Sequence, residues 1–108
     1  MEKVYRTVII DDEESAIDNL CFELQRYSYI SVEGKAKTGT LGLKIIERVR
    51  PDLVFLDVEL PDMLGMDVVA TLSKILCKWK QDSVVSLFLY LNSVFKHKHK
   101  LIHNQAPV

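Results

Sequence analysis

Short apolar runs and helical stripes alternate along the first part of the chain. Residues 4–10 are rich in β-branched side chains and end abruptly at Asp11 and Asp12, which predicts a buried strand. Residues 13–27 then repeat apolar side chains at spacings of three and four, which is typical of an amphipathic helix. The chain therefore opens with a strand followed by a helix.

The same alternation is repeated once more. Residues 29–36 predict a second strand, and a helix follows that Thr40 is expected to cap and that extends to about Val49. Pro51 stops this helix because proline cannot continue the helical hydrogen bonds. The side chains expected to face inward from this helix are Leu41, Ile45, Ile46 and Val49.

A third unit begins with a strand that is apolar on both faces, from Leu53 to Asp57, which suits the centre of a parallel sheet. Residues 65–77 predict a helix, and residues 83–91 predict a fourth strand. The order β-α-β-α-β-α-β predicts an α/β fold with a flavodoxin-like, doubly wound parallel sheet. We expect the sheet to be incomplete, because 17 residues after Leu91 are too few for another helix, strand and helix. The inward side chains of the third helix are expected to be Met66, Val69, Leu72 and Leu76.

Bulk composition narrows the class of protein. A chain of 108 residues with 48% hydrophobic content fits one small globular domain, and a net charge of −1 gives no general attraction to nucleic acid or membranes. No run approaches the ~18 apolar residues of a membrane span, and no signal peptide is recognisable. Cys21 and Cys77 lie far apart and are expected to be reduced thiols. These features predict a cytoplasmic protein.

Charge divides the chain into two parts within that single domain. Residues 1–82 carry all the acidic residues and sum to −4, whereas residues 83–108 carry three lysines and no acid and sum to +3. We interpret 1–82 as the core of the domain and 83–108 as a fourth strand followed by an atypical basic tail. Three lysines without an aromatic platform do not predict nucleic-acid binding by this tail.

Acidic residues follow two strands that the predicted topology makes neighbours. Asp11 and Asp12 end the first strand and Asp57 ends the third, and these strands are adjacent in the flavodoxin-like order. Three close carboxylates repel one another unless a cation joins them, and Mg²⁺ prefers such oxygen ligands. We expect Asp12 and Asp57 to bind the metal directly and Asp11 to contribute, in part through water. A strand-end aspartate is also a known nucleophile in phosphoryl transfer.

These motifs together resemble the receiver domain of bacterial response regulators. The resemblance covers residues 4–73 and is carried by VIIDDEE, RPDLVFLD and VELPDMLGMDVV. It implies that Asp11 and Asp12 bind Mg²⁺, that Asp57 accepts the phosphoryl group, and that Glu59 gives a backbone carbonyl to the metal. A histidine kinase is the implied phosphodonor. The motifs are also similar to receivers that precede LytTR-type DNA-binding domains.

The second half departs from the family pattern. The family places a Ser or Thr at the end of the fourth strand, and Ser86 is the hydroxyl that we assign as this phosphoryl contact. The family also places a Lys, usually followed by Pro, after a fifth strand, and residues 83–108 show no such pair. Three explanations are open: a truncated or frame-shifted regulator, a naturally shortened receiver that pairs with another copy, or a partial sequence.

Three functions remain open from the residues. The leading one is a non-enzymatic, phospho-accepting module of a two-component system. The second is a pseudo-receiver that acts only through binding, and the third is a magnesium-dependent phosphatase with an aspartyl nucleophile. In addition, an apolar fourth strand without a neighbour predicts self-association through the open sheet edge.

Overall fold

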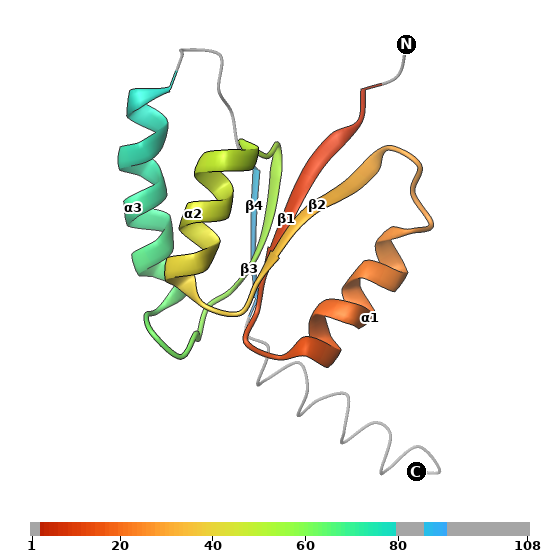
Figure 1. The fold of residues 1–108 in the computed structure, drawn as a ribbon, viewed down its shortest axis with the longest axis horizontal. Coiled ribbons are helices and arrows are strands. Elements are labelled where there is room, and N and C mark those ends of the chain that lie inside the picture. The colour runs from red at the N-terminus through yellow and green to blue at the C-terminus, as the bar shows by residue number, and fades with distance from the viewer. Residues whose placement is uncertain (1–2, 80–85, 91–108) are drawn as a thin grey trace.

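The computed structural model describes residues 3–79 and 86–90, which form three layers. One parallel sheet lies between α1 on one face and the pair α2 and α3 on the other (Figure 1). The predicted basic tail lies outside the described residues. The elements are β1 (Tyr5–Ile10), α1 (Glu14–Leu24), β2 (Ile30–Ala36), α2 (Gly39–Val49), β3 (Leu53–Asp57), α3 (Gly65–Lys78) and β4 (Ser86–Tyr90).

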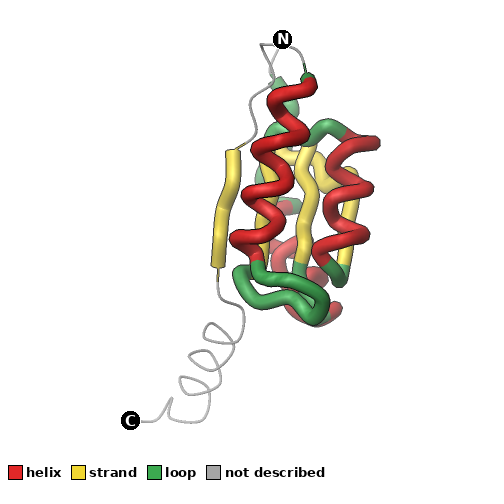
Figure 2. The backbone as a smooth tube through the Cα atoms, turned by 90° about the vertical axis from the view of Figure 1, so that its left-hand side faces the viewer, coloured by secondary structure: helices red, strands yellow, loops and turns green. Residues whose placement is uncertain are grey.

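The order of the strands confirms the flavodoxin-like topology. The sheet runs β2-β1-β3-β4 and every pair is parallel. All strands therefore end at the same edge, which lies at the bottom of Figures 1 and 2. The loops that leave β1, β2 and β3 gather at this carboxyl edge, where open α/β sheets bind ligands.

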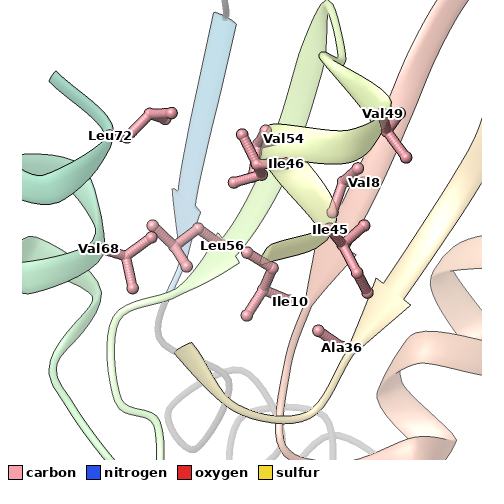
Figure 3. Packing of buried hydrophobic residues seen from close by; sticks show 10 residues of the cluster. All are labelled: Val8, Ile10, Ala36, Ile45, Ile46, Val49, Val54, Leu56, Val68 and Leu72. Carbon is pink, nitrogen blue, oxygen red and sulfur yellow. The ribbon is translucent and has the colours of Figure 1, made fainter. Parts of the chain in front are cut away.

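Successive apolar side chains of the central strands β1 and β3 point to opposite faces of the sheet, so each face carries a hydrophobic cluster. Val8 and Ile10 of β1 join the cluster under α2 and α3, whereas Ile9 joins a smaller cluster under α1. On β3, Leu56 faces α2 and α3 and Phe55 packs toward α1. The larger cluster is drawn in Figure 3 and comprises Val8, Ile10, Ala36, Ile45, Ile46, Val49, Val54, Leu56, Val68 and Leu72.

Two helices each expose one residue that the predicted stripes placed inward, while Ile45, Ile46 and Val49 of α2 are buried as predicted. Leu41 and Met66 were expected to face inward, but they are 46% and 58% exposed. Gly42 lies where α2 crosses β1, since a Cβ there would stand 2.5 Å from the Ile10 side chain. In α3, Leu72 is buried and Val69 and Leu76 pack partly buried against the core, as predicted, while Val68 is buried without having been predicted to face inward. The placements of Leu41 and Met66 were wrong because α2 approaches the sheet at Gly42 and α3 approaches it at Val68.

The start of α2 also differs from the prediction. Thr38, rather than Thr40, is the N-cap, and its hydroxyl oxygen accepts the N–H of Leu41 at 3.1 Å. The helix ends as expected before Pro51, with Arg50 in the left-handed conformation at φ 53°. The Arg50 guanidinium lies 4.8 Å from the ring centre of Trp79, which joins the carboxyl ends of α2 and α3.

Candidate metal centre

Three carboxylates meet at the carboxyl edge of β1 and β3. Asp11 and Asp12 follow β1, and Asp57 is the last residue of β3. Asp11 and Asp57 are 0% and 2% exposed, whereas Asp12 is exposed to solvent. One oxygen from each residue can be chosen so that all three lie within 4.8 Å of one another. The structure therefore brings together the three side chains that the strand pattern predicted to be neighbours.

The two buried carboxylates are oriented by their own loops. The N–H of Glu13 donates to Asp11 Oδ1 at 2.9 Å, and the N–H of Glu59 donates to Asp57 Oδ1 at 3.0 Å. Each aspartate thus accepts a hydrogen bond from the residue two positions further along, as at many turns. These bonds fix the carboxylates at the beginning of the loops that lead to α1 and α3.

The donor set fits a small, hard cation. Mg²⁺ binds oxygen ligands at about 2.1 Å, so two ligands on opposite sides of the ion are roughly 4.2 Å apart. The 4.8 Å limit among the three carboxylates exceeds this by a few tenths of an ångström. A small closure of the exposed Asp12, or one water between a carboxylate and the ion, would complete the set.

The loop between Asp57 and α3 is held tightly against β3. Gly65 donates its N–H to the carbonyl of Val58 at 2.7 Å, and Glu59 forms an antiparallel bridge with Leu64. A Cβ on Gly65 would stand 2.7 Å from Val58 Cα and 2.8 Å from the Asp57 carbonyl oxygen. Only glycine allows this approach, so the loop that carries Glu59 depends on Gly65 for its position.

Hydrogen bonds to Asp62 also join the loop between Asp57 and α3 to the start of α2. The carboxylate of Asp62 accepts the N–H of Gly39 at 2.8 Å, the N–H of Thr40 at 2.9 Å and the hydroxyl of Thr40 at 2.7 Å. The Thr40 hydroxyl, followed by the two N–H groups, lowers the pKa of Asp62 to about 2. Asp62 was not singled out from the sequence, because nothing local shows that it reaches a helix 22 residues away.

Ser86 is not part of this site. In the register of β3 and β4, Ser86 pairs with Leu53, whereas Asp57 pairs with Tyr90. Four residues of parallel strand span roughly 13 Å, so Ser86 lies at the opposite end of the sheet from Asp57. The assignment of Ser86 as a phosphoryl contact was therefore wrong.

An ion pair at the same edge was also missed by the sequence reasoning. Lys37 Nζ lies 2.7 Å from Glu14 Oε1, and this hydrogen bond and charge hold the pKa of Glu14 below its ordinary value. Both residues adjoin the carboxylates, since Lys37 follows β2 directly and Glu14 begins α1. The signal that could have found Lys37 is its position one residue beyond a parallel strand.

Comparison with known proteins agrees with this geometry. The model of the response regulator receiver domain matches residues 7–86, which is most of the chain and includes all three carboxylates. The chain belongs to the response regulator receiver family. Receiver domains are signalling modules of two-component systems, and this confirms the family and the fold expected from the three motifs.

Individual relatives resemble this receiver over the same region. The transcriptional regulatory protein BtsR of Shigella flexneri is 34% identical over 67 residues, which are 62% of this chain and 28% of BtsR. A protein-glutamate methylesterase/protein-glutamine glutaminase of Koribacter versatilis is 39% identical over 69 residues, 64% of this chain and 19% of that protein. The receiver chain thus spans 28% and 19% of the length of these two relatives.

Solved structures agree on the fold. The receiver domain of NarL from Mycobacterium tuberculosis superposes with a TM-score of 0.68 at 21% identity, covering 82% of this chain and 84% of that one. The response regulator domain of Thermotoga maritima CheB gives a TM-score of 0.69 at 20% identity, covering 81% and 60%. In the described part of this receiver no helix is long and apolar enough to cross a membrane. The finer similarity to receivers that precede LytTR domains stays a prediction.

Proposed function

We propose that this receiver accepts a phosphoryl group on Asp57 with the assistance of Mg²⁺. The observation that carries the proposal is the buried Asp57 carboxylate, which shares one edge of the sheet with Asp11 and Asp12. In this proposal the three carboxylates and the backbone carbonyl of Glu59 hold the metal. The bound ion would neutralise charge on the transferring group.

The chemistry assigned to Asp57 is a single displacement at phosphorus. Asp57 Oδ1 accepts the Glu59 N–H at 3.0 Å, which orients the carboxylate that attacks phosphorus. A new O–P bond forms as the bond from phosphorus to the donor breaks. With a histidine kinase, the P–N bond of phosphohistidine breaks, and the imidazole nitrogen leaves with the electron pair and takes up a proton. The product is an aspartyl phosphate.

We propose a division of the single domain into two parts. Residues 1–82 form the receiver core, and 83–108 supply the fourth strand and the basic tail, while the match extends to residue 86. The implied partner is a histidine kinase, we expect the receiver itself in the cytoplasm, and we assign no nucleic-acid or membrane binding to this chain. The receiver itself would be a signalling module rather than an enzyme that acts on a separate substrate.

A small phosphodonor tests the proposed function directly. Incubation with acetyl phosphate and Mg²⁺ is expected to add about 80 Da, one phosphoryl group, on a peptide that contains Asp57. Intact-mass and peptide-mass measurements would detect this adduct. Complete absence of the adduct at every donor concentration would favour a pseudo-receiver that only binds partners. Steady hydrolysis of phosphomonoesters would instead favour an aspartyl phosphatase.

Removal of the metal is expected to slow formation of this adduct by about a hundredfold, because the carboxylates would then repel the anionic donor without compensation. The measurement is the rate of the mass increase before and after treatment with a chelator. Mn²⁺ accepts similar oxygen ligands and is expected to restore the rate. An unchanged rate in the chelated protein would contradict the metal assignment to Asp11, Asp12 and Glu59.

Self-association through the edge of the sheet is a further part of the proposal. β4 is the last strand of the sheet in the described part of the chain, and residues 83–91 are mostly apolar. An edge strand of this composition favours pairing with a second copy. Sedimentation across a wide concentration range is expected to show a rising average mass. A monomer mass at all concentrations would contradict this expectation.

A further inference from the structure

Lys37 occupies a position in the sheet that aligns it with the acidic site. Ile10 pairs with Ala36 of β2 and with Leu56 of β3, so the next residue on each strand forms one row across the carboxyl edge. The N–H of Asp11 donates to the carbonyl of Ala36 at 2.9 Å, which extends the register beyond β1. The row therefore reads Lys37, Asp11, Asp57.

These three side chains also share one face of the sheet. Ile9 and Phe55 pack toward α1, and side chains two residues further along a strand point to the same face. Asp11 and Asp57 therefore continue the α1 side. Lys37 is on this side as well, because its ammonium contacts Glu14 of α1. On the next strand, β4, Tyr90 pairs with Asp57 and is the fourth residue of this row. Lys37 is the cation among these four described residues.

The separation of Lys37 and Asp57 allows the Lys37 ammonium to reach a phosphoryl group on Asp57. Two strand spacings separate the backbones of Lys37 and Asp57 by about 10 Å. An extended lysine reaches about 6 Å from its Cα, and an aspartyl phosphate extends toward it from the other side. The pair with Glu14 is easily broken, since the two side chains are 55% and 70% exposed and such surface pairs are weak.

We propose that Lys37 is a second phosphate-recognition residue of this receiver, which Glu14 holds aside until an anionic phosphodonor or the phosphoryl group itself reaches Asp57. This inference rests on the proposed phosphorylation of Asp57. The ammonium then exchanges the Glu14 carboxylate for phosphoryl oxygens, and no covalent bond of Lys37 changes. Glu14 limits the reaction because it competes with the incoming anion for the same cation.

The alternative role of the ion pair between Lys37 and Glu14 is purely structural, as a contact that holds α1 against the end of β2. The two roles predict different signs for the two single variants. If the ion pair is only structural, Lys37→Met and Glu14→Gln both break it and change the rate of phosphorylation in the same direction. If Glu14 competes for Lys37, the two variants have opposite effects.

The test is the rate of adduct formation from acetyl phosphate at saturating Mg²⁺ and low ionic strength. Lys37→Met is expected to lower the rate about fivefold, and Glu14→Gln is expected to raise it about threefold. Lys35→Met is a matched control, because Lys35 lies on the same strand two residues further from the edge and also acts on Glu14. This control is expected to stay within about twofold of the wild type.

The double variant separates competition from a simple loss of negative charge. When Lys37 is already methionine, Glu14→Gln is expected to give no gain, because there is no cation left to release. A gain that persists in this background would overturn the proposal, since it would come from the lost glutamate charge alone. Lys37→Arg keeps the charge and is expected to restore most of the wild-type rate.

Mg²⁺ binding gives a measurement that does not depend on phosphorylation. The Lys37→Met variant is expected to bind Mg²⁺ about threefold more tightly in calorimetry, because it lacks a cation beside Asp11 and Asp57 that repels the metal. The change in Lys35→Met is expected to be smaller. If the wild type forms no adduct but this ranking holds, the proposed function fails while the placement of Lys37 stands. If Lys37→Met binds Mg²⁺ no more tightly than Lys35→Met does, the role of Lys37 is overturned.

Discussion

Replacing Asp57 with asparagine is expected to reduce the phosphoryl adduct by roughly a hundredfold or more, to below detection. The amide has nearly the same shape as the carboxylate and can still accept the Glu59 N–H, so the fold around it is preserved. However, an amide is not a nucleophile for phosphorus under these conditions, and it removes one anionic metal ligand. Intact-mass measurement with acetyl phosphate and Mg²⁺ checks this result.

Two other aspartates provide matched controls for this variant. Asp18→Asn makes the same chemical change at an exposed position of α1 and is expected to leave the adduct unchanged. Asp12→Asn keeps an oxygen ligand at the exposed side of the site, so the adduct is expected to form more slowly but completely. If Asp57→Asn still forms the adduct at the wild-type rate, the phosphoryl group is carried by another residue and the assignment of Asp57 is wrong.

Truncation of Ile46 to alanine is expected to lower the free energy of unfolding by about 2–5 kcal/mol. Ile46 is 0% exposed and belongs to the cluster that joins α2 to β1 and β3 (Figure 3). Alanine would lose this apolar contact and leave a cavity. Because small domains have unfolding free energies of about 5–15 kcal/mol, urea denaturation should show a clear shift of the midpoint.

Leu41→Ala on the same helix is the control for this effect. Leu41 is 46% exposed, so its truncation is expected to cost less than about 1 kcal/mol. A loss for Leu41→Ala equal to that for Ile46→Ala would mean that α2 packs on the sheet through a different face. The comparison therefore tests the observed orientation of α2, in which Leu41 is the residue that departs from the predicted stripe.

The architecture was predictable because its elements have strong local signals. The strands of residues 4–10 and 53–57 are continuous apolar runs, and the helices between them carry apolar side chains at helical spacing. The rotation of each helix was less predictable, since the position of Leu41 depends on how closely Gly42 approaches Ile10. Periodicity identifies an apolar side of a helix, but packing decides which residues at its margin are buried.

The acidic site was predictable for a related reason. Parallel topology alone brings Asp11, Asp12 and Asp57 to one edge. Ser86 could not be placed in the same way, because an apolar run contains no internal marker of its register against β3. The bonds of Asp62 join elements distant in the sequence, which no spacing rule encodes. The position of Lys37 at the carboxyl edge could be predicted from the end of β2, but its pairing with Glu14 could not.

The bonds of Asp62 bear on how this receiver could be recombined with others. The first two N–H groups of α2 are satisfied by a carboxylate that lies 22 and 23 residues further along the chain, and not by α2 itself. The segment from Gly39 to Asp62 is thus a closed module that contains a helix, a strand and the loop after Asp57. A chimaera that exchanges α2 alone would separate the first N–H groups of the helix from the Asp62 carboxylate, whereas exchange of residues 38–65 would keep the module whole.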